Sequence, residues 1–213
     1  MDPRSFTLPD RIFGQIGSAI KVLAAPSRSA RPRPDAAEGD SDLNAAERLE
    51  SQRLMRVNHA GEIAAQALYR GQALTARDPA VVEAMSRAAT EEGDHLAWCE
   101  QRLRELGGAP SLLNPMWYAG SLAIGAVAGA FGDRTSLGFI SETERQVESH
   151  LEDHLARLPA ADRRSRAILS QMKHDEVRHG QTADSLGGTA LPWAIRLAMR
   201  LTSRVMTKGS YLV

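Results

Sequence analysis

From Asn44 to the C-terminus, apolar residues recur at steps of three and four, which is the period of helices that bury one face. Asn44 is a candidate N-cap, Asp78-Pro79 separates the first two helices, and glycine pairs follow the second and the fourth. The predicted helices cover residues 44–77, 79–106, 134–158 and 160–186, and a last helix follows Pro192 to about residue 206. The first and second helices are joined by a short connection, as are the third and fourth, so the members of each pair should be antiparallel neighbours in an all-α four-helix bundle.

The first 43 residues have a different pattern. Residues 9–24 place apolar groups at helical spacing and predict a short amphipathic helix. Residues 25–43 are rich in Pro, Ser, Arg and Asp, contain almost no apolar side chains, and predict a flexible linker. We therefore divide the chain into an N-terminal region, 1–43, and a helical domain, 44–213.

Acidic residues occupy positions where the apolar stripes of the long helices need a hydrophobic side chain. In the helix 134–158, the stripe of Leu137, Ile140, Val147 and Leu151 is interrupted by Glu144. The other three long helices are interrupted in the same way. The full set of inward polar residues is Glu62, Glu92, His95, Glu144, Glu176 and His179.

This set predicts a metal centre. Several buried carboxylates repel one another, and each is costly to bury without a compensating charge. Within a helix, positions i and i+3 share a face, so Glu92 with His95, and Glu176 with His179, can each chelate a metal. One Glu from each of two helices, with Glu-x-x-His from each of the other two, is the ligand set of ferritin-like di-iron and di-manganese proteins. Carboxylate and imidazole ligands suit iron or manganese.

Several other polar residues lie near these six but outside the apolar stripes. A residue one position from a stripe residue points about 100° around the helix, so we expect these side chains to be solvated. The off-stripe residues are Glu91, Asp94, Glu142, Glu148, His154, His174 and Asp175. Cys99, one turn beyond His95, we expect to fill the core.

Composition narrows the function classes. The 26 basic and 26 acidic residues give no net charge, so no nucleic-acid partner is expected. Cys99 is the only cysteine, which excludes an intramolecular disulfide and a cysteine-based zinc site, and fits a reducing compartment. The N-terminus does not resemble a secretory signal.

Residues 106–132 carry no charge. A membrane-spanning helix is not expected there, because it would place the two helix pairs on opposite sides of the membrane, although they share one metal centre. Two interpretations remain: a helix lying in the membrane interface with Trp117 and Tyr118 at headgroup depth, or a buried crossover helix. The C-terminal helix alternates apolar residues with Arg196, Arg200, Arg204 and Lys208 and would join an interfacial surface. The hypothesis is a peripheral protein on the cytoplasmic face of the inner membrane.

Four motifs resemble the Coq7 family of demethoxyubiquinone hydroxylases, over most of residues 50–213. They are RVNHAGE at 56–62, EGDH at 92–95, ETERQVESH at 142–150 and EVRH at 176–179. The resemblance implies the same six ligands, with Glu92 and Glu176 bridging two iron ions. Some relatives have His-Tyr where this chain has His150-Leu151, so a redox role for that tyrosine does not carry over.

The resemblance implies an O2-dependent di-iron monooxygenase of ubiquinone biosynthesis. It would hydroxylate the ring of 2-polyprenyl-3-methyl-6-methoxy-1,4-benzoquinol (3-demethoxyubiquinol), taking electrons from NADH or a reductase, since the chain has no Rossmann fingerprint. Other ubiquinone-synthesis proteins or a second copy of the chain are possible partners. Two alternatives stay open: a ferritin-like iron-binding or iron-oxidising protein without an organic substrate, and a non-enzymatic membrane-associated scaffold. Oxygen consumption with a quinol distinguishes the three.

Overall fold

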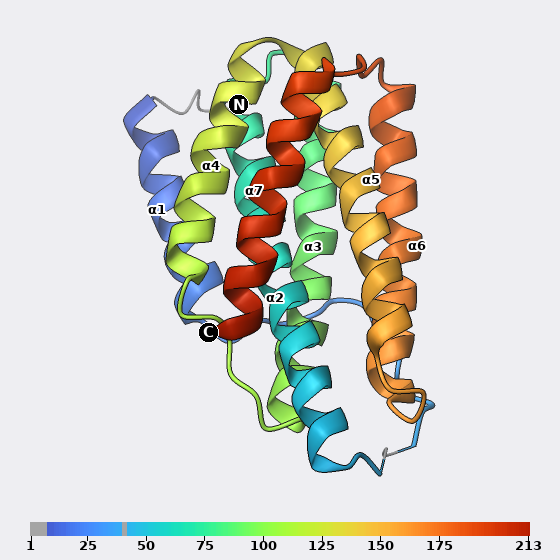
Figure 1. The fold of residues 1–213 in the computed structure, drawn as a ribbon. Coiled ribbons are helices and arrows are strands. Elements are labelled where there is room, and N and C mark those ends of the chain that lie inside the picture. Colours follow the sequence, from blue (N-terminus) through green and yellow to red (C-terminus); the bar gives the residue numbers. More distant parts are fainter. Residues whose placement is uncertain (1–7, 40–41) are drawn as a thin grey trace.

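The structure, a computed structural model, describes residues 8–39 and 42–213, and within these ranges the chain forms helices and no strand (Figure 1). The helices are α1 (Leu8–Ala24), α2 (Ala45–Thr75), α3 (Pro79–Glu105), α4 (Asn114–Ala130), α5 (Asp133–Arg157), α6 (Arg163–Ser185) and α7 (Trp193–Leu212). The four long helices of the bundle agree with the predicted ranges to within a few residues, whereas α7 is longer than predicted.

Local signals set the ends of the bundle helices. The Asn44 side chain accepts hydrogen bonds from the backbone of Ala46 and Glu47, and the Glu47 side chain accepts from the backbone of Asn44. This capping box satisfies amide groups that the first turn of α2 leaves free. Asp78 caps α3, with Pro79 at its first position, where a missing amide hydrogen costs nothing.

Helices α2, α3, α5 and α6 form an antiparallel bundle. Its core has one apolar cluster toward each end and polar residues between them. One hydrophobic cluster includes Leu54, Trp98 and Leu169. A second, at the other end, includes Tyr69 and Leu137. In each of the four helices, the predicted metal-binding residues lie along the chain between the two clusters. The polar centre is therefore held between two packed apolar layers.

Helix α4 packs against α2 through small residues. A Cβ atom on Gly125 would lie 2.1 Å from the backbone oxygen of Leu68, and one on Gly71 would lie 2.2 Å from the backbone oxygen of Leu122. Such distances are impossible for a real side chain, so these glycines permit the close approach of the two helices. The uncharged segment therefore approaches the bundle through small residues, together with Tyr118 and Leu122, and exposes Met116, Ile124 and Val127.

Two aromatic side chains of this segment, which the interfacial interpretation placed at headgroup depth, make contacts within the protein. Tyr118 is buried, and its ring packs with Ile63 and Leu96. Trp117 is half-buried, and its indole nitrogen donates to the Ser210 hydroxyl of α7 at 3.0 Å. Both aromatic side chains thus contact neighbouring helices, and only Trp117 keeps part of its surface exposed.

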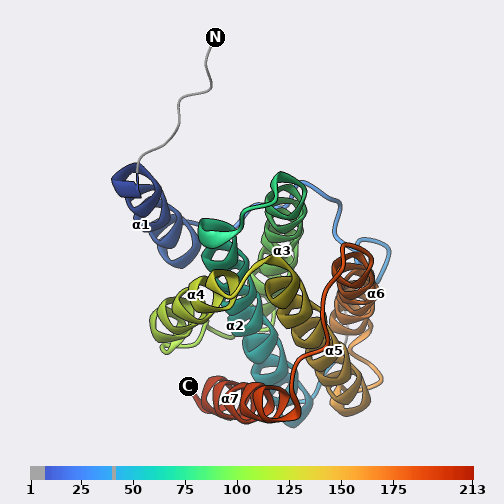
Figure 2. The same cartoon turned by 90° about the horizontal axis from the view of Figure 1, so that it is seen from above.

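Helices α1, α4 and α7 lie outside the bundle on one side, with α1 the most separate of the three (Figures 1 and 2). Helix α7 lies across α2 and contacts α5. Among the described residues, no helix is both long and apolar enough to cross a membrane.

The segment that follows α1 contacts the bundle, which the flexible-linker prediction did not anticipate. The carboxylate of Asp35, 1% exposed, accepts from the guanidinium groups of Arg33 and Arg164. The backbone of Ala30 donates to Asp94 of α3. Residues 25–39 are therefore fastened by ion pairs and hydrogen bonds, which take the place of apolar contacts. The domain boundary at residue 43 stays a prediction.

Candidate metal centre

All six inward polar residues meet in the middle of the bundle. Glu62 comes from α2, Glu92 and His95 from α3, Glu144 from α5, and Glu176 and His179 from α6. Each is buried, with between 0 and 8% of its surface exposed. Because the i, i+3 spacing repeats on α3 and α6, each of these helices presents a carboxylate and an imidazole to the same space.

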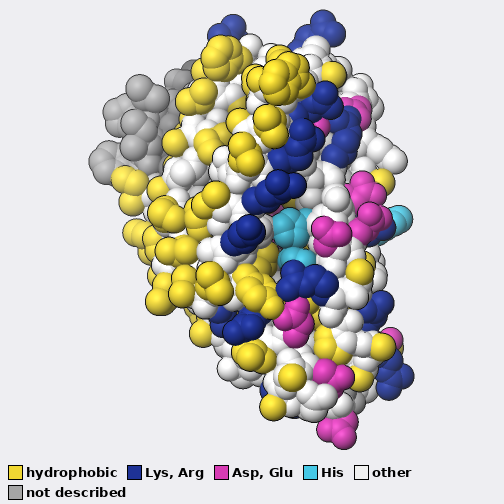
Figure 3. Space-filling view, viewed as in Figure 1, with side chains coloured by type: hydrophobic (Ala, Val, Ile, Leu, Met, Phe, Trp, Pro, Cys, Tyr) yellow, Lys and Arg dark blue, Asp and Glu magenta, His cyan; other side chains and the backbone are white. Residues whose placement is uncertain are grey.

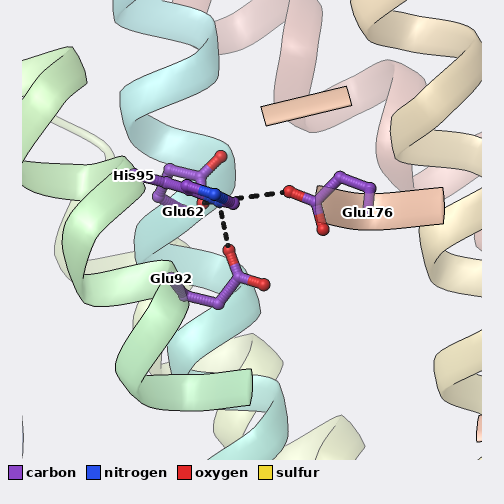
Figure 4. Close-up of side chains that lie close together, drawn as sticks. All are labelled: Glu62, Glu92, His95 and Glu176. Atoms are coloured by element: carbon purple, nitrogen blue, oxygen red, sulfur yellow. Dashed lines mark hydrogen bonds and ion pairs between the residues drawn. The ribbon is translucent and has the colours of Figure 1, made fainter. Parts of the chain in front are cut away.

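The residues form two overlapping groups whose potential ligand atoms lie within 4.8 Å of one another. One group is Glu62, Glu92, His95 and Glu176, and the other is Glu92, Glu144, Glu176 and His179. Figure 4 shows the first group, with dashed lines from the His95 ring to the carboxylates of Glu92 and Glu176. Only Glu92 and Glu176 belong to both groups, the arrangement that two bridging carboxylates require.

The imidazoles face the carboxylates through the same ring atom. Nδ1 of His95 lies 3.2 Å from Glu92 and 3.3 Å from Glu176. Nδ1 of His179 lies 3.2 Å from Glu176 and 3.3 Å from Glu92. The Glu-x-x-His residues of α3 and of α6 are thus arranged alike, so the two halves of the site are approximately symmetric.

The electrostatics of the cluster are unbalanced without a cation. Burial raises the pKa of Glu62 well above its ordinary value, and the adjacent Glu92 carboxylate adds to the increase. Burial raises the pKa of Glu144 likewise, with a contribution from Glu176. Burial disfavours a charged His179, yet Glu176 and Glu92 outweigh it and raise its pKa to about 12.

Two carboxylate oxygens of the cluster lack the hydrogen-bond partner that a buried acceptor needs. The Oε2 atom of Glu62 and the Oε1 atom of Glu144 are buried without a hydrogen-bond partner. A buried acceptor without a partner is destabilising, and metal coordination would satisfy it. Four carboxylates and two imidazoles are also the donor set that suits iron or manganese. The residues present therefore fit a two-metal centre.

Each imidazole also has a carboxylate on its far side, and sequence reasoning missed both. Asp175 Oδ2 lies 3.0 Å from Nε2 of His95, and Glu91 Oε2 lies 3.1 Å from Nε2 of His179. A carboxylate on the outer nitrogen fixes the orientation of a ligand histidine and makes it a stronger ligand. The prediction that Asp175 is solvated is wrong, since its side chain is fully buried.

Other off-stripe residues are also buried, so the solvated interpretation fails for them. Asp94 and Glu142 are 5% and 6% exposed. His154 is 3% exposed and its Nδ1 lies 3.0 Å from the side-chain oxygen of Asn58. His174 is exposed, as predicted. Cys99 is buried in the core beside Met172, also as predicted.

A small cavity reaches the carboxylates from the side of α7. Glu62, Glu92, Glu144 and Glu176 form its polar floor. Its walls come from α2, α5 and α7, and include Val57, Asn58, Gly61, Val147, His150, Leu151, Ser203, Met206 and Thr207. The cavity therefore lies between the four carboxylates and helix α7.

Comparison with known proteins gives a consistent picture. A family model described as "Ubiquinone biosynthesis protein COQ7" matches residues 49–210. The 3-demethoxyubiquinol 3-hydroxylase of Chromobacterium violaceum is 53% identical over 96% of this chain and 99% of its own. That of Azoarcus sp. is 55% identical with the same coverage.

A solved structure has a similar fold. The bacterioferritin-related protein of Bacteroides fragilis, described as a dodecameric thioferritin, superposes with a TM-score of 0.53 at 19% identity. The match covers 67% of this chain and 85% of that one. At this identity the likeness concerns the fold, which is therefore ferritin-like.

Proposed function

Since this chain belongs to the family of ubiquinone biosynthesis protein COQ7, we propose that it is the di-iron monooxygenase that hydroxylates the ring of 3-demethoxyubiquinol. The observation that carries the proposal is the buried group of four carboxylates and two histidines with a cavity above it. Glu62, Glu92, His95, Glu144, Glu176 and His179 would hold two iron ions, with Glu92 and Glu176 shared between them.

The reaction converts a ring C–H bond of the quinol into C–OH. One atom of O2 enters the product and the other leaves as water, which requires two electrons and two protons from NADH or a reductase. The iron pair supplies the activation of O2 when bound. The protein must bring the ring close to the carboxylates, keep it oriented, and exclude water from the reaction.

The cavity beneath α7 is suited to those tasks. Its apolar wall includes Val57, Leu151 and Met206, and its floor is made of the proposed ligands. His150 also lines it, in edge contact with His154. A quinol entering from the side of α7 would meet apolar walls around its ring and His150 as a polar group for a ring oxygen. His150 is therefore a candidate to orient the substrate.

The substrate carries a polyprenyl tail, and the outer face of α1, α4 and α7 is suited to lipid. We define the outer apolar surface as the exposed side chains Ile16, Ile20, Leu112, Met116, Ile124, Val127, Phe131, Trp193, Ile195, Leu197, Leu201 and Val205. Figure 3 shows apolar side chains gathered over these helices, with a row of basic side chains beside them. Arg196, Arg200, Arg204 and Lys208 are exposed on α7 at intervals of four residues.

An exposed apolar area of this extent favours a membrane, and adjacent basic residues favour anionic lipid. We therefore propose peripheral attachment to the cytoplasmic face of the inner membrane. Helix α7 would lie between the lipid and the cavity, so that the ring reaches the metal centre while the tail remains in the bilayer.

Turnover under isotopically labelled oxygen gas tests the function. Purified, iron-loaded protein is given 3-demethoxyubiquinol in vesicles and a reductant, and the product is analysed by mass spectrometry. We expect one labelled oxygen in the new hydroxyl group. Label arriving from water would contradict the mechanism. Iron oxidation without any hydroxylated product would favour the ferritin-like alternative, and neither reaction would favour a scaffold.

A further inference from the structure

Arg31, which lies outside the bundle helices, contacts both acidic residues beside the His95 half of the centre. Its Nη1 atom lies 2.8 Å from Asp175 Oδ2, the same oxygen that contacts His95 Nε2. Its Nε atom lies 2.8 Å from Asp94 Oδ2. A guanidinium has several donors in one rigid plane, so Arg31 can hold the Asp94 and Asp175 carboxylates in a fixed relation between α3 and α6.

The segment around Arg31 is itself anchored. The backbone amide of Ala30 donates to Asp94 at 2.6 Å, and that of Ser27 donates to Glu100 at 2.9 Å. The Trp98 indole donates to the Ser29 hydroxyl, and the Arg31 guanidinium lies 4.7 Å from the centre of the same ring. Trp98 in turn lies against the His95 ring. Every one of these contacts is made to α3, on which His95 lies.

Among the described residues, no group from outside the bundle helices contacts Glu91, the carboxylate beside His179. Glu91 is paired with Arg178 from α6, whose guanidinium also contacts Asp175 Oδ1 at 3.0 Å. The Asp175 side chain is fully buried, whereas the Glu91 side chain is 32% exposed. The His95 half is thus supported by Arg178 and, from outside the bundle helices, by Arg31, whereas the His179 half is supported by Arg178 alone.

We propose that Arg31 is a positioning residue for the metal ion held by His95, and that residues 27–31 are part of the metal centre. Arg31 keeps Asp175 against His95 Nε2 and so keeps Nδ1 directed at the shared carboxylates. This inference rests on the proposed two-iron site. Its consequence is that the two metal positions are unequal, with the His95 position the more firmly held.

The experiment compares Arg31→Ala with Arg33→Ala in the full-length protein. Arg33 is a matched control because it lies two residues away and pairs with Asp35 and Glu105, remote from both histidines. Anaerobic titration with Fe(II) against a chelator gives the dissociation constants, and Mössbauer spectroscopy gives the environment of each iron. We expect Arg31→Ala to weaken one constant roughly 10-fold, the lower end for groups outside the ligand sphere, and to alter one iron environment.

Arg33→Ala is expected to leave both constants unchanged. Arg31→Lys should recover part of the loss, because one ammonium can contact one of the two carboxylates. Thermal unfolding of the metal-free proteins separates a folding defect from a local one. Equal weakening of both positions, or no weakening, would overturn the inference. A parent protein that binds fewer than two irons would instead contradict the proposed site itself.

Discussion

Glu144 contributes a buried carboxylate with an unpartnered oxygen on the α5 side of the centre. Replacing Glu144 with alanine should remove one ligand of the His179 group and leave the remaining carboxylates uncompensated in a low-dielectric space. We expect the Glu144→Ala protein to fold and to bind about one iron fewer per chain. Metal analysis of the purified protein, alongside thermal unfolding, measures both.

Glu148→Ala is the matched control, since Glu148 lies one turn along the same helix and is partly exposed. It should retain the full metal content. Equal loss from both variants would contradict the assignment of Glu144. Glu91→Ala is not a suitable control, because Glu91 supports His179 and its removal should weaken binding as well.

The buried His154 should make the folded protein less stable as the pH falls below neutral. Burial lowers its pKa from 6.5 to about 3, with further lowering from His150 and Arg157. A histidine with a lowered folded-state pKa contributes full stability above its ordinary pKa, and the contribution is lost as the pH falls toward the folded value. Between pH 7 and pH 5 the loss is about 2 kcal/mol, at 1.36 kcal/mol per unit of pKa.

Denaturant unfolding of the metal-free protein at the two pH values tests this expectation. In His154→Gln, the loss of stability between pH 7 and pH 5 should be smaller than in the parent by about 2 kcal/mol. The exposed His174 provides the control, and His174→Gln should leave the pH dependence unchanged. If the two variants behave alike, the burial of His154 is not what sets the acid response.

The sequence predicted the six polar residues that meet in the bundle, but not the acidic residues that contact the two histidines. Glu144 and its partners interrupt apolar stripes, and periodicity detects such interruptions. Asp175 and Glu91 lie one position off their stripes, and periodicity alone assigns them to solvent. What brings them to the centre is the packing of α3 against α6, where the acidic residue before Glu92 or Glu176 reaches the histidine of the other helix. The signal was present as an acidic residue before the Glu of both Glu-x-x-His pairs.

At the scale of the helices, the caps and the periodicity predicted where each bundle helix begins and ends, because those signals are local in the sequence. The position of α4 against the bundle depends on contacts between distant residues, which local signals do not reveal. The segment is uncharged, and its sequence does not say which helix it approaches. The structure pairs Gly125 with the backbone of Leu68 and Gly71 with that of Leu122. One face of the segment is therefore buried, as the crossover interpretation predicts, and the other face is exposed, so the membrane-interface interpretation stays a prediction.

Gly125→Ala tests the close approach of α4 to α2. The added Cβ would lie 2.1 Å from the Leu68 oxygen, so the helices must separate, at a cost of roughly 1–3 kcal/mol for an overpacked contact. Gly120→Ala is the matched control in the same helix, because nothing lies within 4 Å of its added Cβ. It should be neutral or stabilise by roughly 0.5–1 kcal/mol. Chemical denaturation measures both, and equal effects would contradict the packing.

At the scale of the whole molecule, α1, α4 and α7 lie on one side of the bundle (Figure 2) and carry exposed apolar side chains there, and the cavity that reaches the carboxylates is lined by α7. The sequence indicated that the segments 106–132 and 193–206 are interfacial candidates. It did not indicate which of their side chains point outward. Trp117 contacts α7 and Leu122 packs against α2, so a charge at either position would disturb the fold as well as membrane binding. The outward side chains are the better test.

Val127→Asp combined with Phe131→Asp places two charges on the outer apolar surface, at positions 59% and 76% exposed. Burying a large apolar side chain is worth roughly 1.5–3 kcal/mol. We therefore expect binding to anionic vesicles to weaken about tenfold or more, with normal metal content and unfolding. Turnover of a long-tailed quinol should fall through a higher KM, while a short-tailed quinol in solution reacts as before. Leu186→Asp, at the end of α6 on the far side of the bundle, controls for added charge and should bind vesicles normally. If the double variant sediments with vesicles as well as the parent, lipid does not cover this surface and the membrane proposal is wrong.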